Sequence, residues 1–334
     1  EEWISDKTRY ACDGLKNQRL DSAFLKKGNK FEKISWKEAY LKIFDKISNT
    51  SSEKISGITG DMINMETLFA IKEFFEKTIK SKNLDSRSQN YYVNSTNRNN
   101  YIFNSKITGI EETDLIILIG TNPRYEATIL NSRIRKAYIN NNIDIFSIGD
   151  VGELTYPYIS LDNSTKVINE IINNEHKLSD LIKKSQKPMI ILGQSLLKMK
   201  SASYVFEELK KYLLENNKIN NKWNALNILS NNASTVGAYD LELLSSKNGN
   251  NDTLEKINKN EFDVIFLFGQ DNLKIKKKNE YIIYMGSHGD QGAEMADIIL
   301  PSAAYTEQDG YFTNLEGKLQ KSYNASYPPG EAKE

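Results

Sequence analysis

Six short apolar segments, each ending at a glycine, recur along the chain at residues 55–60, 115–120, 143–149, 189–193, 264–269 and 282–286. Their apolar residues run continuously instead of alternating with polar ones, which is typical of strands buried on both faces of a parallel sheet. A glycine lets the chain turn sharply where such a strand ends. The pattern therefore predicts parallel strands with tight loops at their carboxyl ends.

Apolar residues with helical spacing fill the intervals between these strands. In residues 65–79 they fall near one face of a helix, and residues 126–138 and 204–214 behave similarly. Alternating strands and helices favour right-handed crossover units and a doubly wound α/β fold. At about 150 residues per domain, 334 residues suggest two domains. We expect the seam between Tyr156 and Asn174, where the apolar runs thin out.

The charge balance argues against a partner that is recruited by charge. Lys plus Arg and Asp plus Glu each total 44, so no net field attracts nucleic acid or anionic lipid. The basic run 274–278 has no interleaved aromatic residues and is interpreted as a solvated face. The Asn-rich stretches 216–221 and 247–252 are interpreted as solvated loops that reflect AT-rich codon usage. The apolar runs are too short to span a membrane.

The loops at the strand ends are where a doubly wound sheet presents ligands. They are residues 60–61, 120–124, 193–195, 269–272 and 286–292. None matches the dinucleotide fingerprint G-x-G-x-x-G or the P-loop. Residues 286–292 hold three glycines that could surround a phosphate, but a close-packed turn is the preferred interpretation, with His288 serving the turn.

The remaining reactive side chains form no recognisable set. Ser195 lacks the second glycine of a nucleophile elbow, because Leu197 stands in its place. His176 is expected on an exposed helical stretch, and Cys12, the single cysteine, is expected to be inert.

One cysteine and two histidines cannot build a zinc or iron–sulfur site. Glu111, Glu112 and Asp114 are interpreted as a solvated acidic turn. We therefore assign no catalytic, cofactor-binding or metal residue from the sequence.

Three blocks resemble the largest iron–sulfur subunit of respiratory complex I, which is the 75 kDa subunit in mitochondria. Residues 1–15 (EEWISDKTRYACDGL) resemble the start of its carboxyl-terminal region, and residues 120–127 (GTNPRYEA) with 131–136 (NSRIRK) resemble a second block. Residues 296–301 (ADIILP) and 307–317 (EQDGYFTNLEG) are similar to a third block, which molybdopterin oxidoreductases share.

The resemblance implies a molybdopterin-oxidoreductase-like fold of two interlocked doubly wound, Rossmann-like parallel-sheet lobes. On this basis we expect an opening segment (1–50), a first lobe (51–160), a second lobe (161–295) and a crossover segment at the lobe boundary (296–334). Residues 296–317 are then expected to be largely buried, including Phe312 and Leu315. Both chain ends fall inside the usual family member, so the chain is expected to be a processed product or a separately encoded part.

The resemblance also implies a place in NADH:ubiquinone oxidoreductase, on the matrix side of the mitochondrial inner membrane or the cytoplasmic side of a bacterial membrane. The family's cluster ligands cannot be carried over to a chain with one cysteine. We therefore expect a structural part without cofactors of its own. Iron–sulfur clusters and FMN are expected in neighbouring parts, including a Cys-rich region or chain.

Two alternatives remain open at this point. One is an active molybdopterin-dependent oxidoreductase subunit, similar to formate dehydrogenase, which metal content would distinguish. The other is a free-standing binding protein for a small ligand, which would be a monomer with a deep, occupied cleft.

Overall fold

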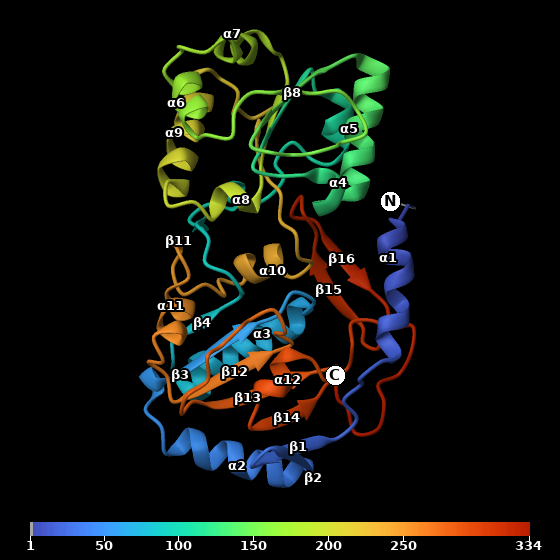
Figure 1. Cartoon of the computed structure of the whole chain (residues 1–334), viewed down its shortest axis with the longest axis vertical. Helices are drawn as coiled ribbons and strands as arrows, with labels where there is room; N and C mark the ends of the chain where they lie inside the picture. The colour runs from blue at the N-terminus through green and yellow to red at the C-terminus, as the bar shows by residue number, and fades with distance from the viewer. Residues whose placement is uncertain (1–2) are drawn as a thin grey trace. The chain divides into compact units, whose positions relative to one another are not determined.

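The chain folds into two units, each built on its own sheet (Figure 1). The computed structural model describes residues 3–334, so the first two residues of the opening block lie outside the described part. Unit 1 comprises the residues up to 6, residues 91–231 and residues 315–317. Unit 2 comprises residues 7–90, 232–314 and 318–334.

Unit 1 contains a five-stranded parallel sheet in the order β10-β9-β6-β7-β8. Its strands are β6 (Leu115–Ile119), β7 (Asp144–Ile148), β8 (Ile159–Ser160), β9 (Pro188–Leu192) and β10 (Leu226–Ile228). Every residue of β6 and β9 is buried, as the continuous apolar runs predict. In this register Ile117 lies between Phe146 and Ile190.

Helices flank the sheet of unit 1. They are α4 (Pro123–Glu126), α5 (Thr128–Asn141), α6 (Lys166–Ile172), α7 (Lys177–Lys184), α8 (Gln194–Leu197) and α9 (Ala202–Glu215). Unit 1 also contains the short helices η4 (Arg98–Asn100) and η5 (Thr108–Glu112) and the two-residue strand β5 (Val93–Asn94). Leu130, Ile134 and Ala137 of α5 pack with Ile116 and Leu118 of β6 in one buried cluster. The helical spacing of residues 126–138 therefore predicted the face that is buried.

Unit 2 contains a seven-stranded sheet in the order β2-β1-β14-β13-β12-β3-β4. Its strands are β1 (Ala23–Lys27), β2 (Lys30–Ile34), β3 (Ile55–Thr59), β4 (Leu84–Asp85), β12 (Val264–Phe268), β13 (Tyr281–Gly286) and β14 (Ile298–Pro301). The strands from β14 to β4 are parallel, and β1 and β2 form an antiparallel edge. All five residues of β3 and of β12 are buried.

Two helices of unit 2, α2 and α3, begin at polar capping residues. Ser35 accepts a hydrogen bond from the amide of Glu38 at the start of α2 (Trp36–Ser48), and Asn64 accepts one from the amide of Thr67 at the start of α3 (Met65–Glu73).

The remaining elements are α1 (Asp6–Tyr10), η1 (Ala11–Lys16), η2 (Ser52–Lys54), the π-helix η3 (Phe74–Ile79), α10 (Thr235–Asp240), β11 (Asn248–Gly249), α11 (Asp252–Asn258), α12 (Gln291–Met295), β15 (Gly310–Thr313) and β16 (Leu319–Ser322).

All six predicted strands are present, and the doubly wound α/β fold is confirmed. The two units nevertheless divide the chain differently from the expected lobes. Strand β3 pairs with β12, although residues 91–231 of unit 1 lie between these two strands in the sequence. The interval from Tyr156 to Asn174 is no seam, since it supplies β8 and α6 to unit 1. Residues 296–314 belong to unit 2 and 315–317 to unit 1, with Phe312 and Leu315 half-buried.

Candidate functional site

Three of the five glycine loops predicted from the sequence come together in unit 2. Residues 60–61, 269–272 and 286–292 follow β3, β12 and β13, which are neighbouring parallel strands. The other two, residues 120–124 and 193–195, follow β6 and β9 in unit 1. Ligands of open α/β sheets bind at such carboxyl ends, so the loops of unit 2 are the first place to look for a site.

A cavity of about 1240 Å³ lies in unit 2 beside these loops. Its lining comes from α2, from α3 and η3, and from the sheet strands β12 and β13. Asp61, Asp271 and His288 line it where the strands end, and apolar side chains line most of the remainder. It is the candidate functional site of this unit.

The Asp61 carboxylate is held by two amide side chains. Asn232 donates to Oδ1 and Asn272 to Oδ2, both at 2.8 Å. Burial raises the pKa of Asp61, and the two amide hydrogen bonds oppose that shift. Both of these partners are neutral amide groups.

Asp271 accepts hydrogen bonds from the Tyr284 hydroxyl at 3.0 Å and from the amide of Gly292 at 3.2 Å. Burial raises its pKa, and the nearby Asp290 raises it further, while the hydrogen bonds and His288 act in the other direction. His288 serves the turn, as expected: its Nδ1 lies 2.8 Å from the Ser287 hydroxyl and its carbonyl accepts from Tyr284.

Several glycines at the strand ends pack closely against protein atoms. A Cβ on Gly60 would lie 1.8 Å from the carbonyl oxygen of Gly269, and one on Gly286 would lie 2.1 Å from the Tyr284 hydroxyl. In unit 1, a Cβ on Gly193 would lie 2.3 Å from the carbonyl oxygen of Gly120. These glycines are therefore required by the close packing of one loop on the next.

The backbone amides of these loops are also engaged. Gly60 donates to Phe268, Gly269 to Met285, Gly120 to Ile148 and Gly193 to Ile119, at 2.6 to 3.0 Å. In the 286–292 loop, Gly289 donates to Gln18 and Gly292 to Asp271. A phosphate cradle needs several amides pointing into one open concavity, and here each of these amides already has a carbonyl or carboxylate acceptor.

The third resembling block contains a buried ion pair. Glu307 accepts hydrogen bonds from both terminal nitrogens of Arg19 and one from the amide of Ala304. Burial alone would raise the pKa of Glu307, but the Arg19 guanidinium holds it below its usual value. The pair links the segment before β1 to the segment after β14.

The other candidates from the sequence are structural. His176 is not a freely exposed side chain as expected: it caps α7, with Nδ1 accepting from the amide of Leu178 at 3.1 Å. Cys12 is exposed, and its thiol donates to the carbonyl of Arg9. Ser195 is exposed on α8, and Leu197 is buried beneath it.

The acidic turn before β6 makes specific contacts instead of being merely solvated. Glu111 accepts from Arg133 at 2.6 Å and from Lys136 at 2.9 Å, and the hydrogen bond from Lys136 lowers its pKa. Asp114 accepts from the hydroxyl of Ser185 and from the amide of Gln186. These carboxylates therefore attach α5 and the start of β9 to β6.

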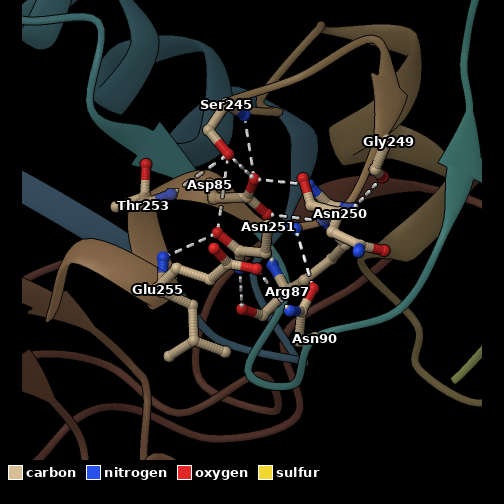
Figure 2. Close-up of polar contacts among 10 residues, drawn as sticks. Asp85, Arg87, Asn90, Ser245, Gly249, Asn250, Asn251, Thr253 and Glu255 are labelled. Carbon is tan, nitrogen blue, oxygen red and sulfur yellow. Dashed lines mark hydrogen bonds and ion pairs between the residues drawn. The ribbon is translucent and has the colours of Figure 1, made fainter. Parts of the chain in front are cut away.

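Sequence reasoning missed a buried polar network at the end of β4, which Figure 2 shows. Arg87 donates from Nε to Asp85 Oδ1 at 2.9 Å and from Nη2 to Oδ2 at 2.8 Å, and both side chains have no exposed surface. Ser245 donates to Asp85 Oδ2 from its amide and its hydroxyl. Arg87 also donates to the carbonyls of Gly249 and Asn250.

The network corrects the interpretation of residues 247–252 as a solvated loop. Asn251 is fully buried, donates to the carbonyl of Arg87 at 2.7 Å and caps α11 by accepting from the amide of Leu254. Asn90 accepts from the amide of Asn251 and donates to Glu255. The spacing Asp-x-Arg was the one available signal, and it is too common to identify a buried pair.

Two features are absent from residues 3–334. No group of three or more His, Cys, Asp or Glu side chains in this range is arranged to hold a metal ion. No helix in the same range combines the length and apolar character that crossing a membrane requires.

Comparisons with known proteins agree with one another. The family model of molybdopterin oxidoreductases matches residues 19–334. The chain is 38% identical to the NADH-ubiquinone oxidoreductase 75 kDa subunit of Reclinomonas americana and to the G subunit of the NADH-quinone oxidoreductase of Rickettsia bellii. It is 37% identical to the mitochondrial NADH-ubiquinone oxidoreductase 78 kDa subunit of Candida albicans.

These matches cover 100% of the chain and 50%, 48% and 46% of the three relatives, so the chain spans about half the length of the curated relatives it matches. Among solved structures, acetylene hydratase from Pelobacter acetylenicus matches with a TM-score of 0.55 over 96% of this chain and 61% of that chain. At 11% sequence identity this likeness concerns the fold alone.

Proposed function

The chain belongs to the molybdopterin oxidoreductase family, and its homologues are the 75 kDa, 78 kDa and G subunits of NADH-quinone oxidoreductases; we propose that it is a structural, cofactor-free part of respiratory complex I. In this role it supports the cluster-bearing part of a 75 kDa-type subunit in the peripheral arm, through which electrons pass from NADH toward ubiquinone. It carries no catalytic residue of its own.

One observation carries the proposal: the identity to complex I subunits extends over the whole chain at 37–38%, in relatives from three distinct organisms. An isolated shared motif would not produce that extent of similarity. Because the chain spans about half of each relative, its activity and partners are inferred from theirs.

The chemistry of the residues present does not fit a bound molybdopterin in the cavity of unit 2. The cofactor carries phosphate, which requires cationic side chains or free backbone amides. The cavity of unit 2 instead presents the carboxylates of Asp61 and Asp271. The glycine amides beside it donate hydrogen bonds to acceptors within the protein. We therefore derive no reaction step through that cofactor.

The structure suggests how such a part would contribute. Two sheets with fully buried central strands, together with the Arg19–Glu307 and Arg87–Asp85 pairs, give rigid units on which a neighbouring polypeptide can dock. The partners we propose are other peripheral-arm subunits, including a Cys-rich iron–sulfur region or chain. Nucleic acid and a direct membrane contact have no place in this account.

The proposed location is the matrix side of the mitochondrial inner membrane. Relatives from Reclinomonas americana and Candida albicans support it, the latter named as mitochondrial, and the Rickettsia relatives indicate the equivalent cytoplasmic face of a bacterial membrane as the alternative.

A tagged chain, purified under native conditions from its own cells, tests the proposal. We expect it to comigrate with NADH dehydrogenase activity and iron–sulfur subunits in a large assembly, with molybdenum and tungsten far below one atom per chain. A chain that carries stoichiometric molybdenum or tungsten would instead support the active oxidoreductase. A monomer free of other subunits would contradict membership of complex I.

A further inference from the structure

The two faces of the unit 2 sheet are covered by different segments of the chain. Parallel neighbours are usually joined through a helix that packs on the sheet. The link from β12 to β13, residues 269–280, lies wholly in the described part of the chain and contains no helix. Its apolar residues Leu273 and Ile275 join the core on the opposite face, with Ile265 and Ile282.

The face that remains has α2 on one side and α3 with η3 on the other. Side chains at helical spacing on α2 line the cavity between them: Trp36, Tyr40, Phe44 and Ile47. The facing wall is formed by Ala70, Phe74 and Thr78. We call this space the α2–α3 groove.

Aromatic side chains in the groove are left open to water. Phe44 is 70% exposed and Tyr40 is 49% exposed. A partner that covered these side chains would remove their apolar surface from water, which favours binding. Exposed aromatic residues that converge on one groove are typical of a binding surface.

The floor of the groove consists of sheet residues that point to this face. Phe266 and Phe268 of β12 and Ile283 and Met285 of β13 line it, two residues apart along each strand. A five-residue strand is about 17 Å long, which corresponds to about three turns of α-helix. The dimensions suit a short helix that lies along β12 and β13.

The end of the groove at the strand termini is negatively charged. Its acidic lining residues are Asp61, Glu66, Asp271, Asp309 and Glu334, of which Asp309 pairs with Lys321 at 3.7 Å, and its basic lining residue is Lys333. Lys333 is held over the ring of Trp36, at 4.7 Å from its centroid. Asp61 and Asp271 have hydrogen bonds to amide, hydroxyl and backbone donors, all neutral.

We propose that the α2–α3 groove binds an amphipathic helix from a partner polypeptide of the complex, with Lys or Arg at the end that lies against Asp61 and Asp271. Apolar side chains at positions i, i+3, i+4 and i+7 of that helix fill the space between Phe44 and Phe74. This inference rests on the proposed function, since it names the kind of partner that the structural part holds. Charge complementarity selects a basic helix over an anionic ligand.

Site-specific photo-cross-linking in the native assembly tests the proposal. Benzoylphenylalanine is placed at Phe44 in one variant and at Leu41 in a control. Leu41 is a matched control because it lies on the same helix and is 61% exposed, but it does not line the groove. We expect position 44, and not position 41, to cross-link to one peptide with helical apolar spacing and a basic end.

Other outcomes of the cross-linking overturn the proposal. They are a product formed only with a second copy of this chain, a product formed only within the chain, or no product at position 44 in a fully assembled complex. Equal yield of the same peptide from both positions would also overturn it, because the groove would then not be what is recognised.

The cross-linked peptide, made synthetically, is then titrated against the full-length chain. We expect Phe44→Glu to weaken binding at least tenfold, Leu41→Glu to change it less than twofold, and Asp271→Asn to weaken it several-fold at low salt only. Circular dichroism of each variant confirms that the chain is folded. Equal binding by Phe44→Glu and the unchanged chain would refute the groove.

This design separates the two claims. If the chain does not purify with complex I, the proposed function fails, but cross-linking within whatever assembly it does occupy still reports on the groove. If it purifies with complex I and position 44 yields no partner peptide, the groove proposal fails alone.

Discussion

Arg87 and Asp85 form a bidentate ion pair with no solvent-exposed side-chain surface, only two residues apart at the end of β4. The pair also binds the amide and hydroxyl of Ser245 and the carbonyls of Gly249 and Asn250. It therefore fixes residues 245–250 against the edge strand, just before the chain leaves unit 2 at Asn90.

Removing one member of this pair should be far more harmful than removing both. Arg87→Met leaves Asp85 as a buried charge without its counter-ion, and breaking such a pair costs about 3 to 5 kcal/mol. The double variant Asp85→Leu with Arg87→Met should recover part of that loss. Urea unfolding of the three chains measures the coupling.

The exposed pair Glu112–Lys187 provides the control, with an Nζ to Oε2 distance of 2.6 Å. Glu112→Gln should change the free energy of unfolding by less than about 1 kcal/mol, because solvent screens the pair. Equal effects of Arg87→Met and Glu112→Gln would show that the buried network does not stabilise the chain.

Ionisation of Asp271 should lower the free energy of unfolding as the pH rises. Burial raises its pKa in the folded chain, so the folded state binds this proton more tightly than the unfolded state, whose Asp titrates near about 3.9. Below that pH the aspartic acid is neutral in both states. As pH rises toward the folded-state pKa, ionisation becomes more favourable in the unfolded chain, and stability is lost.

Asp271→Asn removes this titration but keeps an oxygen for the amide of Gly292. The difference in the free energy of unfolding between this variant and the unchanged chain should shift in favour of the variant from about pH 4 upward and then become constant. Urea unfolding at a series of pH values measures the difference. A difference that is flat with pH would show that the Asp271 pKa is not raised in the folded chain.

Gly60 should tolerate no side chain. The Cβ of alanine would lie 1.8 Å from the carbonyl oxygen of Gly269, which is backbone and cannot rotate away. We expect Gly60→Ala to lower the free energy of unfolding by about 1 to 3 kcal/mol or more. At Gly14 nothing lies within 4 Å of the added Cβ, so Gly14→Ala should be neutral or slightly stabilising.

Thermal unfolding of the two alanine variants makes the comparison. A Gly60→Ala chain as stable as Gly14→Ala would mean that the strand-end loops are not closely packed, and the case against a phosphate cradle there would weaken.

The strands and several helix faces could be predicted from sequence because burial leaves a local pattern. β6 and β12 are continuous apolar runs, and the apolar face of α5 follows helical spacing. Which strands share a sheet could not be predicted, because Gly57 pairs with Phe266 through contacts that local pattern does not encode. The expected lobe boundaries failed to match the units for this reason.

The polar interior was hidden for a different reason. Asn251 stands in an Asn-rich stretch that has the composition of a solvated loop, yet it is fully buried because Arg87 and Leu254 satisfy its hydrogen bonds. Similarly, His176 gave no signal of capping beyond its place before Lys177 and Leu178. Such roles depend on partners that only the fold supplies.

In the proposed function, this chain contributes architecture and no redox chemistry to complex I. Ile117 lies in the middle of β6 with 1% of its surface exposed. Ile117→Val should cost about 0.5 to 1.5 kcal/mol and Ile117→Ala about 2 to 5 kcal/mol. These variants alter the stability of unit 1 in steps, and neither one introduces a charge.

The most direct test is NADH:quinone turnover divided by the amount of assembled complex I, measured across the unchanged chain, Ile117→Val and Ile117→Ala. We expect the amount of assembled complex to fall in step with stability while turnover per assembled complex stays constant. A fall in turnover per complex, with assembly and iron–sulfur signals intact, would contradict it.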